Sequence, residues 1–411
     1  MIFYKENKFL ILSGLALIAV LAAIYILAAG FLSGADYTYL SDKSTTTPTF
    51  KPVESIHLKT PQPLKGLYLT ACAASTPSLR NHVVKLVNDT EINAIIVDLK
   101  DYSGTVAFPT VDESLQNHEA SGCRIPNLKE LVTSWHQQGI YVIGRITVFQ
   151  DPAYSKKHPE LAVKRSDGVT VWKDRKGLSF IQVGAKPYWD HVIALSKEAY
   201  NLGIDEINFD YVRFPSDGNM QDISFPLSAG QSKPEALENF FKYLHQQLKP
   251  IGVVMSADLF GMTTTNTDDL NIGQVLERAM PYFDYIAPMV YPSHYPPKFN
   301  NWANPNDHPY DLIYFVLKEG ARRAVASTTP VAAFTHERIG TSTPALYSKP
   351  VYEANKIRPW LQDFDYGGNY DVPEVKAQIK ATYDVGLSSW MIWDPSNKYT
   401  PGAYEPASLS H

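Results

Sequence analysis

Cysteine is scarce in this chain, and so is any excess of positive charge. The 411 residues include 2 cysteines, which excludes a disulfide-rich scaffold and a metal or iron–sulfur site built from several cysteines. Lys and Arg number 37 against 42 Asp and Glu, so the formal net charge is −5. Nucleic-acid-binding domains carry a basic surface, and we therefore expect no nucleic-acid partner.

The motifs of several common enzyme classes are missing as well. The sequence contains no HExxH pair, no Walker-type glycine-rich loop and no Gly-x-Ser-x-Gly elbow. Its 11 histidines are scattered, which gives no sign of a multi-histidine metal site. We expect neither a metal nor another cofactor.

The N-terminal part contains one long apolar stretch. Residues 9–32 carry no charge, and at 1.5 Å per residue they can cross a hydrocarbon core of about 30 Å. Because Lys5 and Lys8 precede the stretch, we expect a cytoplasmic end at residues 1–8 and a single transmembrane anchor at 9–32. The rest of the chain would then lie on the extracytoplasmic side of the cell membrane.

The alternative to an anchor is a cleaved signal peptide, with Ala28-Ala29-Gly30 at its cleavage site, although the apolar stretch exceeds the usual signal-peptide length. Residues 33–63 are rich in Thr, Ser and Pro, which favours an extended tether ahead of a folded domain at 64–411. Outside the cytoplasm, Cys72 and Cys123 could form a disulfide, and two unpaired buried thiols are equally compatible with the sequence.

Apolar runs alternate with helical patterns through residues 64–411. The expected strands are 65–71, 94–100, 141–148, 206–214, 251–260, 285–291, 357–364 and 387–394, with helical patterns between them. Eight strands alternating with helices over about 330 residues predict a single (β/α)8 TIM barrel. A doubly wound open sheet is the competing topology, but no glycine-rich turn follows the first strand.

Three long connections follow the C-terminal ends of expected strands, at 149–185, 215–233 and 292–308. In a barrel such loops build the active-site face. Residues 325–356, between the sixth and seventh strands, have no clear assignment.

Side-chain alternation brings carboxylates into the predicted barrel. On the fourth strand Asp210 shares a face with polar residues, whereas the apolar residues of the other face should contact the outer helices. The same reasoning turns Asp258 inward on the fifth strand, and Asp98 and Lys100 inward on the second. All of them lie near C-terminal strand ends, so we expect them at one mouth.

Paired carboxylates at a barrel mouth are what glycoside hydrolysis requires. One acid protonates the leaving oxygen, and the other attacks carbon or activates water. We expect Asp210 to be the ionised group, with Arg213 stabilising its charge, and Asp258 to be the proton donor. The alternative is that these carboxylates form ion pairs that only hold the barrel together, with Lys100, Arg145 and Arg213 as possible partners.

Other residues are candidates for contact with a substrate: Asp98, Lys100, Arg213, Tyr291, His294, Gln362 and Trp393. The aromatic rings among them could stack on sugars, although rings more commonly pack in cores. On the seventh strand Gln362, rather than Asp363, has the parity of an inward residue.

Segments along most of 64–400 resemble an uncharacterised family of TIM-barrel domains described as glycoside hydrolases. The matching runs are Lys65-Gly-Leu-Tyr-Leu-Thr, Ile96-Val-Asp-Leu-Lys-Asp, Asp205-Glu-Ile-Asn-Phe-Asp-Tyr-Val-Arg-Phe-Pro215, Ser256-Ala-Asp-Leu-Phe-Gly261, Met289-Val-Tyr-Pro-Ser-His-Tyr295, Arg358-Pro-Trp-Leu-Gln-Asp-Phe364 and Trp390-Met-Ile-Trp-Asp-Pro395. The resemblance implies a barrel that acts on a polysaccharide outside the cytoplasm.

More distantly, the chain is similar to alpha-amylase-like hydrolases, in which a fourth-strand Asp is the nucleophile and a fifth-strand acid the proton donor. Asp210 and Asp258 match those positions, although the fifth-strand residue is often the longer Glu in that group. We therefore expect a membrane-anchored glycoside hydrolase. The alternative is a catalytically inactive barrel that binds cell-wall or capsule polysaccharide.

Overall fold

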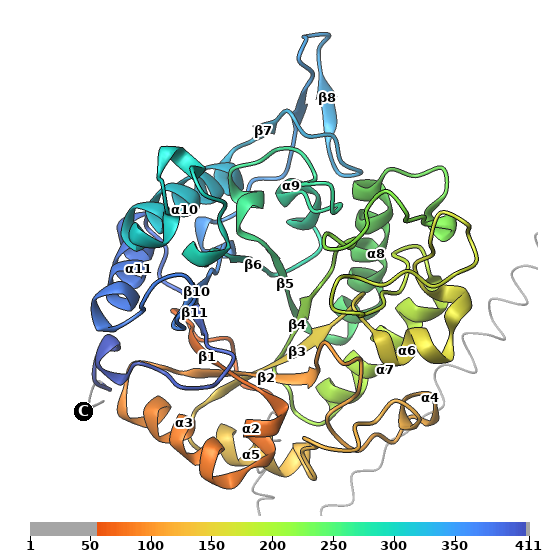
Figure 1. The fold of residues 1–411 in the computed structure, drawn as a ribbon. Coiled ribbons are helices and arrows are strands. Elements are labelled where there is room, and N and C mark those ends of the chain that lie inside the picture. Colours follow the sequence, from red (N-terminus) through yellow and green to blue (C-terminus); the bar gives the residue numbers. More distant parts are fainter. Residues whose placement is uncertain (1–55, 408–411) are drawn as a thin grey trace, which may run out of the picture. The chain divides into compact units, whose positions relative to one another are not determined.

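Eight parallel strands close into a barrel within residues 56–407, the part of the chain that the computed structural model describes (Figure 1). In chain order they are β1 (Lys65–Leu69), β2 (Ala94–Lys100), β3 (Tyr141–Thr147), β4 (Glu206–Asp210), β5 (Val254–Phe260), β6 (Tyr285–Met289), β10 (Trp360–Gln362) and β11 (Trp390–Trp393). The barrel closes where β11 pairs with β1. Each strand overlaps one of the eight predicted from the sequence, so the predicted (β/α)8 barrel is confirmed.

Helices surround the barrel, as Figure 1 shows. They are α2 (Ala71–Ser75), α3 (Pro77–Asp89), α4 (Glu113–Gln116), α5 (Leu128–His136), α6 (Pro152–Lys157), α7 (Lys186–Asn201), α8 (Lys233–Leu248), α9 (Leu276–Ala279), α10 (Pro309–Val325) and α11 (Val372–Asp384). Local signals fix their starts: α8 begins with a capping box between Ser232 and Glu235, and proline occupies its first turn. The α-helix between β5 and β6, α9, is a single turn.

The alternation of side chains along the strands produces two apolar layers. The larger one lies between the strands and the helices, where α8 buries Leu237, Phe240 and Leu244 completely. A smaller cluster fills the inside of the barrel and includes Tyr141 and Trp360. The interior is therefore packed at its base, and only its C-terminal mouth can hold a ligand.

Residues 325–356, which the sequence left unassigned, contain a small separate sheet. Its strands are β7 (Thr328–Thr329), β8 (Glu337–Ile339) and β9 (Leu346–Ser348), paired antiparallel in the order β7-β9-β8. The β8 hairpin projects away from the barrel in Figure 1. Strands of two or three residues carry too short an alternation to be recognised in a sequence.

The expected tether ends in ordered contacts before Leu64. The backbone N–H of Leu58 donates to Asp205 Oδ1 at 2.6 Å, and Thr60 Oγ1 is 3.0 Å from the Tyr141 hydroxyl. Leu58 also packs against the cluster inside the barrel. Residues 56–63 therefore belong to the packed domain, although the sequence placed them in the tether.

The cytoplasmic end at 1–8, the anchor at 9–32 and the tether up to residue 55 lie outside the described residues. Among residues 56–407, no helix combines the length and the apolar character that a membrane crossing requires.

The two cysteines form a disulfide, Cys72–Cys123, across 51 positions of sequence. The bond joins α2, directly after β1, to the long connection that precedes α5. Of the two possibilities that the sequence left open, the structure has the paired one.

Candidate active site

A cavity of about 400 Å³ opens at the C-terminal mouth of the barrel. Its lining is Arg145, Asp210, Tyr211, Arg213, Asp258, Phe260, Gly261, Met262, Met289, Tyr291, His294, Tyr295 and Trp393. Six residues that the sequence singled out are among them: Asp210, Asp258, Arg213, Tyr291, His294 and Trp393. This face carries the active site in barrel enzymes.

Asp210 ends β4 and is held as an ion pair. Arg145 on β3 donates through Nε to Asp210 Oδ2 at 3.1 Å and through Nη2 to the same oxygen. The backbone N–H of Tyr211 donates to Asp210 Oδ1 at 2.5 Å. These charge-assisted contacts are buried, because Asp210 is only 4% exposed.

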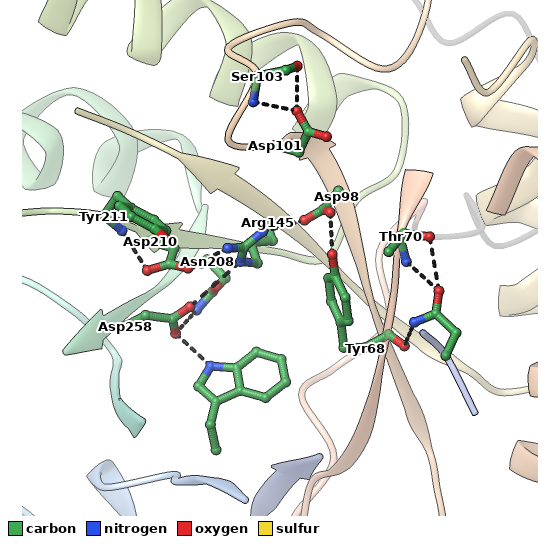
Figure 2. Close-up of polar contacts among 12 residues, drawn as sticks. Tyr68, Thr70, Asp98, Asp101, Ser103, Arg145, Asn208, Asp210, Tyr211 and Asp258 are labelled. Carbon is green, nitrogen blue, oxygen red and sulfur yellow. Dashed lines mark hydrogen bonds and ion pairs between the residues drawn. The ribbon is translucent and has the colours of Figure 1, made fainter. Parts of the chain in front are cut away.

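Arg145 therefore takes the place that the sequence gave to Arg213 as the partner of Asp210. Figure 2 shows Arg145 between Asp98 and Asp210. The reason is register: Asp98, Arg145 and Asn208 are paired across β2, β3 and β4, so their side chains share one face at one height. The sequence offered three cations as partners of the inward carboxylates, Lys100, Arg145 and Arg213, and the structure places Arg145 against Asp98 and Asp210.

Asp258 lies on β5 in a different environment. Asn208 Nδ2 and Trp360 Nε1 each donate to its Oδ1 at 2.8 Å, and its Oδ2 is 4.0 Å from Arg145 Nε. Burial and the negative charge of Asp210 raise the pKa of Asp258 well above its usual range, against the opposing effect of these donors. Asp258 thus favours the protonated form beside an ionised neighbour.

The two carboxyl groups are close enough to act on one bond. An oxygen of Asp210 and one of Asp258 lie 3.1 and 4.0 Å from the same Arg145 Nε, so these oxygens are at most about 7 Å apart. Carboxyl groups are about 5–5.5 Å apart in retaining glycosidases and about 6.5–9.5 Å apart in inverting ones. The limit accommodates the retaining geometry and the short end of the inverting one.

Asp98 lies behind Arg145 and does not line the cavity. Its carboxylate accepts from Arg145 Nη1 at 2.6 Å and from the Tyr68 hydroxyl, and it is 3% exposed. The Arg145 guanidinium lies 4.9 Å from the Trp393 ring, which stacks on Tyr68 at 3.8 Å. Asp98 therefore orients Arg145, and a substrate would meet Arg145 and Trp393 instead.

Lys100 points away from the mouth. The register between β2 and β3 shifts between Asp98 and Lys100, which is a β-bulge that reverses the expected parity. Lys100 Nζ therefore reaches the outer layer, where it contacts Asp151 at 2.8 Å and the Tyr188 hydroxyl at 3.1 Å. The interpretation of Lys100 as an inward residue was wrong, because alternation ends at a bulge.

Gln362 faces the mouth, yet its polar atoms are already used. Its Oε1 accepts from the Ser293 hydroxyl at 2.8 Å, and its Nε2 donates to the Phe364 carbonyl at 2.9 Å. Gln362 thus connects the loop after β6 to the loop after β10. It shapes the rim near His294, which lines the cavity beside Tyr291 with ring centroids 5.2 Å apart.

A second hollow of about 930 Å³ adjoins the first, and His294 and Trp393 line both. Its other walls include Phe364, Tyr366 and Lys398. Together the two hollows offer room for more than one sugar ring, with an indole at their junction.

Another carboxylate–arginine pair lies deeper in the barrel. Glu206 on β4 is bound by Arg358, by the Ser256 hydroxyl at 2.6 Å and by the Tyr141 hydroxyl at 3.4 Å. Both Glu206 and Arg358 are fully buried, and neither lines the cavity. These contacts are those of a buried structural ion pair.

Comparison with known proteins identifies a family. A family model described as "Putative glycosyl hydrolase domain" matches residues 66–399. No curated protein matches the chain.

Several solved structures are similar to this chain. The PgaB (BpsB) glycoside hydrolase domain from Bordetella bronchiseptica is 12% identical, with a TM-score of 0.56 over 84% of this chain and 100% of that one. Alpha-L-fucosidase isoenzyme 2 from Paenibacillus thiaminolyticus is 12% identical, with a TM-score of 0.51 over 83% of this chain and 47% of that one. A hypothetical protein from Ruminiclostridium thermocellum is 36% identical over 50% of this chain and 98% of its own, with a TM-score of 0.43. The first two show a shared fold.

Proposed function

Because the chain belongs to the family described as "Putative glycosyl hydrolase domain", we propose that it hydrolyses glycosidic bonds of a polysaccharide with Asp210 and Asp258. The observation that carries this proposal is the pair itself. Two carboxyl groups on adjacent strands share one cavity and one arginine, and their surroundings favour opposite protonation states.

Each group has a role that follows from its contacts. Asp258, with its raised pKa, donates a proton to the glycosidic oxygen of the leaving sugar. Asp210, kept ionised by Arg145, attacks the anomeric carbon or activates a water molecule. Trp393, at the junction of the two hollows, offers a ring face on which a sugar can stack.

The test is turnover on soluble and insoluble polysaccharides, measured as the release of reducing ends by the purified full-length chain. We expect Asp210→Asn and Asp258→Asn each to lower turnover by about 10² or more, because each removes a general acid–base or nucleophilic group. Asp311→Asn is the matched control, since Asp311 is exposed on α10 and does not line the cavity.

Full turnover in both variants would contradict the proposal. Binding of polysaccharide without any turnover, in the wild-type chain and both variants alike, would instead favour the inactive binding barrel.

The proposed location is the extracytoplasmic face of the cell membrane. The apolar stretch at 9–32 supports an anchor, and the Cys72–Cys123 disulfide supports an oxidising compartment. We expect the intact chain to remain with membranes at high salt. Recovery in the soluble fraction with a new N-terminus near Gly30 would show cleavage instead.

A further inference from the structure

Arg213 stands apart from the other buried arginines. Among residues 56–407, the arginines less than 10% exposed are Arg145, Arg213, Arg323 and Arg358. Arg145, Arg323 and Arg358 each lie within ion-pair distance of at least one carboxylate. Arg213, at 9% exposed, has no such partner in the described part of the chain, and its Nη1 donates to the Phe214 carbonyl and the Ser216 hydroxyl.

The surroundings of Arg213 hold its guanidinium at the cavity with ring faces rather than with a carboxylate at ion-pair distance. Its centre lies 4.9 Å from the Tyr211 ring and 4.9 Å from the Phe260 ring, and all three residues line the mouth cavity with Asp210 and Asp258. Ring faces attract a cation, but they supply no counter-charge. Burial has the largest effect on the pKa of Arg213 and lowers it, against the opposing effects of Tyr211, Asp210 and Asp174. For Arg145, by contrast, Asp210 and Asp98 raise the pKa despite burial.

Backbone strain also points to this place. Tyr211 has a φ of +51°, a left-handed conformation that a non-glycine residue with a bulky side chain seldom adopts. The turn ends the alternation of β4 between Asp210 and Arg213, so the Tyr211 ring lies at the cavity and against the guanidinium. Strain of this kind persists where the surrounding structure demands a specific arrangement.

We propose that Arg213 binds an anionic group on the sugar substrate, so that the polysaccharide carries carboxylate, sulfate or phosphate substituents. The planar guanidinium has only N–H donors, and two of them can bind two oxygens of such an anion. A buried cation without a counter-charge costs free energy, which a bound anion would offset. This substrate class rests on the proposed hydrolase function, because the anion would lie in the cavity of the two catalytic carboxyl groups.

The test measures binding to matched pairs of glycans by the full-length chain carrying Asp210→Asn, which we expect to lower turnover by about 10² or more. One arm pairs polyglucuronate, polymannuronate and polygalacturonate with their carboxyl-reduced forms. A second arm pairs sulfated and phosphorylated glucans with unmodified glucan. We expect the anionic member of at least one pair to bind roughly ten- to hundred-fold more tightly than the neutral one, which is the gain of a charge-assisted contact. The arm in which this preference appears shows which kind of anion is recognised.

Three further variants assign that preference to Arg213. Arg213→Met keeps the length and the ring contacts, and we expect it to abolish the preference while the melting temperature stays constant or rises. Arg213→Lys keeps the charge but not the fork, and we expect it to retain part of the preference. Arg338→Met removes an exposed arginine from β8 and serves as the control.

Equal or better binding of the neutral members, no binding in any pair, or an equal loss for both members in Arg213→Met would overturn the inference. Its failure is distinguishable from that of the hydrolase proposal. Hydrolysis of neutral glycans that depends on Asp210 and Asp258 would support the hydrolase proposal and contradict the anion site. Binding of anionic glycans through Arg213, without hydrolysis by the wild-type chain, would support the anion site and contradict the hydrolase proposal.

Discussion

Glu206 and Asp210 lie on the same strand and the same face of β4, yet their surroundings differ. Glu206, deep in the barrel, has one arginine of its own, Arg358, and two hydroxyl donors. Asp210, at the mouth, shares the single arginine Arg145 with two other carboxyl groups. A buried ion pair is therefore not evidence of a functional site by itself. The mouth group is distinguished by its excess of carboxyl groups over cations and by its opening to a cavity.

The excess has a direct electrostatic consequence. Three carboxylates of like charge around one guanidinium cannot all be ionised in a buried place, so one of them keeps its proton. Asp258 has the weakest contact with Arg145, at 4.0 Å, and is the one whose pKa rises well above its usual range through burial and the charge of Asp210. The arrangement of the charges thus favours a transferable proton on Asp258.

The largest effect should come from breaking the deep pair. In Glu206→Gln the fully buried Arg358 loses its counter-charge, and we expect the free energy of unfolding to fall by about 3–5 kcal/mol. Urea unfolding measures this loss, and turnover per folded molecule should stay within a few-fold of wild type. Glu337→Gln, on exposed β8, is the control. A turnover loss like that of Asp210→Asn would show that the deep pair is more than structural.

Removal of a carboxyl group at the mouth should change the free energy of unfolding in the opposite direction. A carboxyl group whose pKa is raised by folding binds its proton more tightly in the folded chain, so its contribution to stability falls as pH rises above about 4. We expect Asp258→Asn to remove this cost and to raise the free energy of unfolding at pH 7 by about 1–3 kcal/mol while turnover is lost. Urea unfolding at pH 4 and pH 7 checks it: a variant less stable than wild type at pH 7 would contradict the assignment.

The pH dependence of turnover should report the same proton. Because Asp258 acts in its protonated form, we expect kcat to fall about tenfold per pH unit above its raised pKa. The measurement is kcat between pH 4 and 10 for wild type and for the Asp311→Asn control. A decline that begins near pH 4, the ordinary range of a carboxyl group, would mean that Asp258 is not the acid.

The sequence was informative where alternation is uninterrupted. The apolar or alternating patterns of β2 to β6 located the strands, and parity alone turned Asp210 and Asp258 inward. It failed where a local irregularity ends that alternation. One such place is the bulge before Lys100, and the other is the left-handed Tyr211, which ends β4 short of the expected 206–214.

Partnerships between strands were harder to predict than orientation. Arg213 is close to Asp210 in the sequence, yet Arg145 is its partner because β3 lies beside β4. Arg145 is paired with Asn208, two residues before Asp210 on the same face of β4. The Cys72–Cys123 pair depends in the same way on how distant segments come together. Register across strands is not encoded in a single strand's pattern, so such pairs require the structure.

The smallest effect concerns a single hydrogen bond between the packed interior and the mouth. Trp360 belongs to the cluster inside the barrel, and its indole N–H donates to Asp258 Oδ1 at 2.8 Å. This bond favours the ionised form and so lowers the pKa of Asp258 against the larger effect of burial. Trp360→Phe keeps a ring in the cluster but removes the donor, while Asn208 still donates to the same oxygen. We therefore expect the alkaline limb of kcat to move to higher pH by about 0.5–1 unit.

Trp390→Phe is the matched control for that shift. Trp390 is equally buried on the neighbouring strand β11, but its indole N–H donates to the Tyr383 hydroxyl of α11, outside the barrel. Both variants lose the same atoms from a packed position, so both should lose a similar amount of stability. Only Trp360→Phe should move the pH profile. A shift of equal size in both variants, or a shift to lower pH in Trp360→Phe, would contradict this prediction. Either result would show that the hydrogen bond from Trp360 does not control the proton on Asp258.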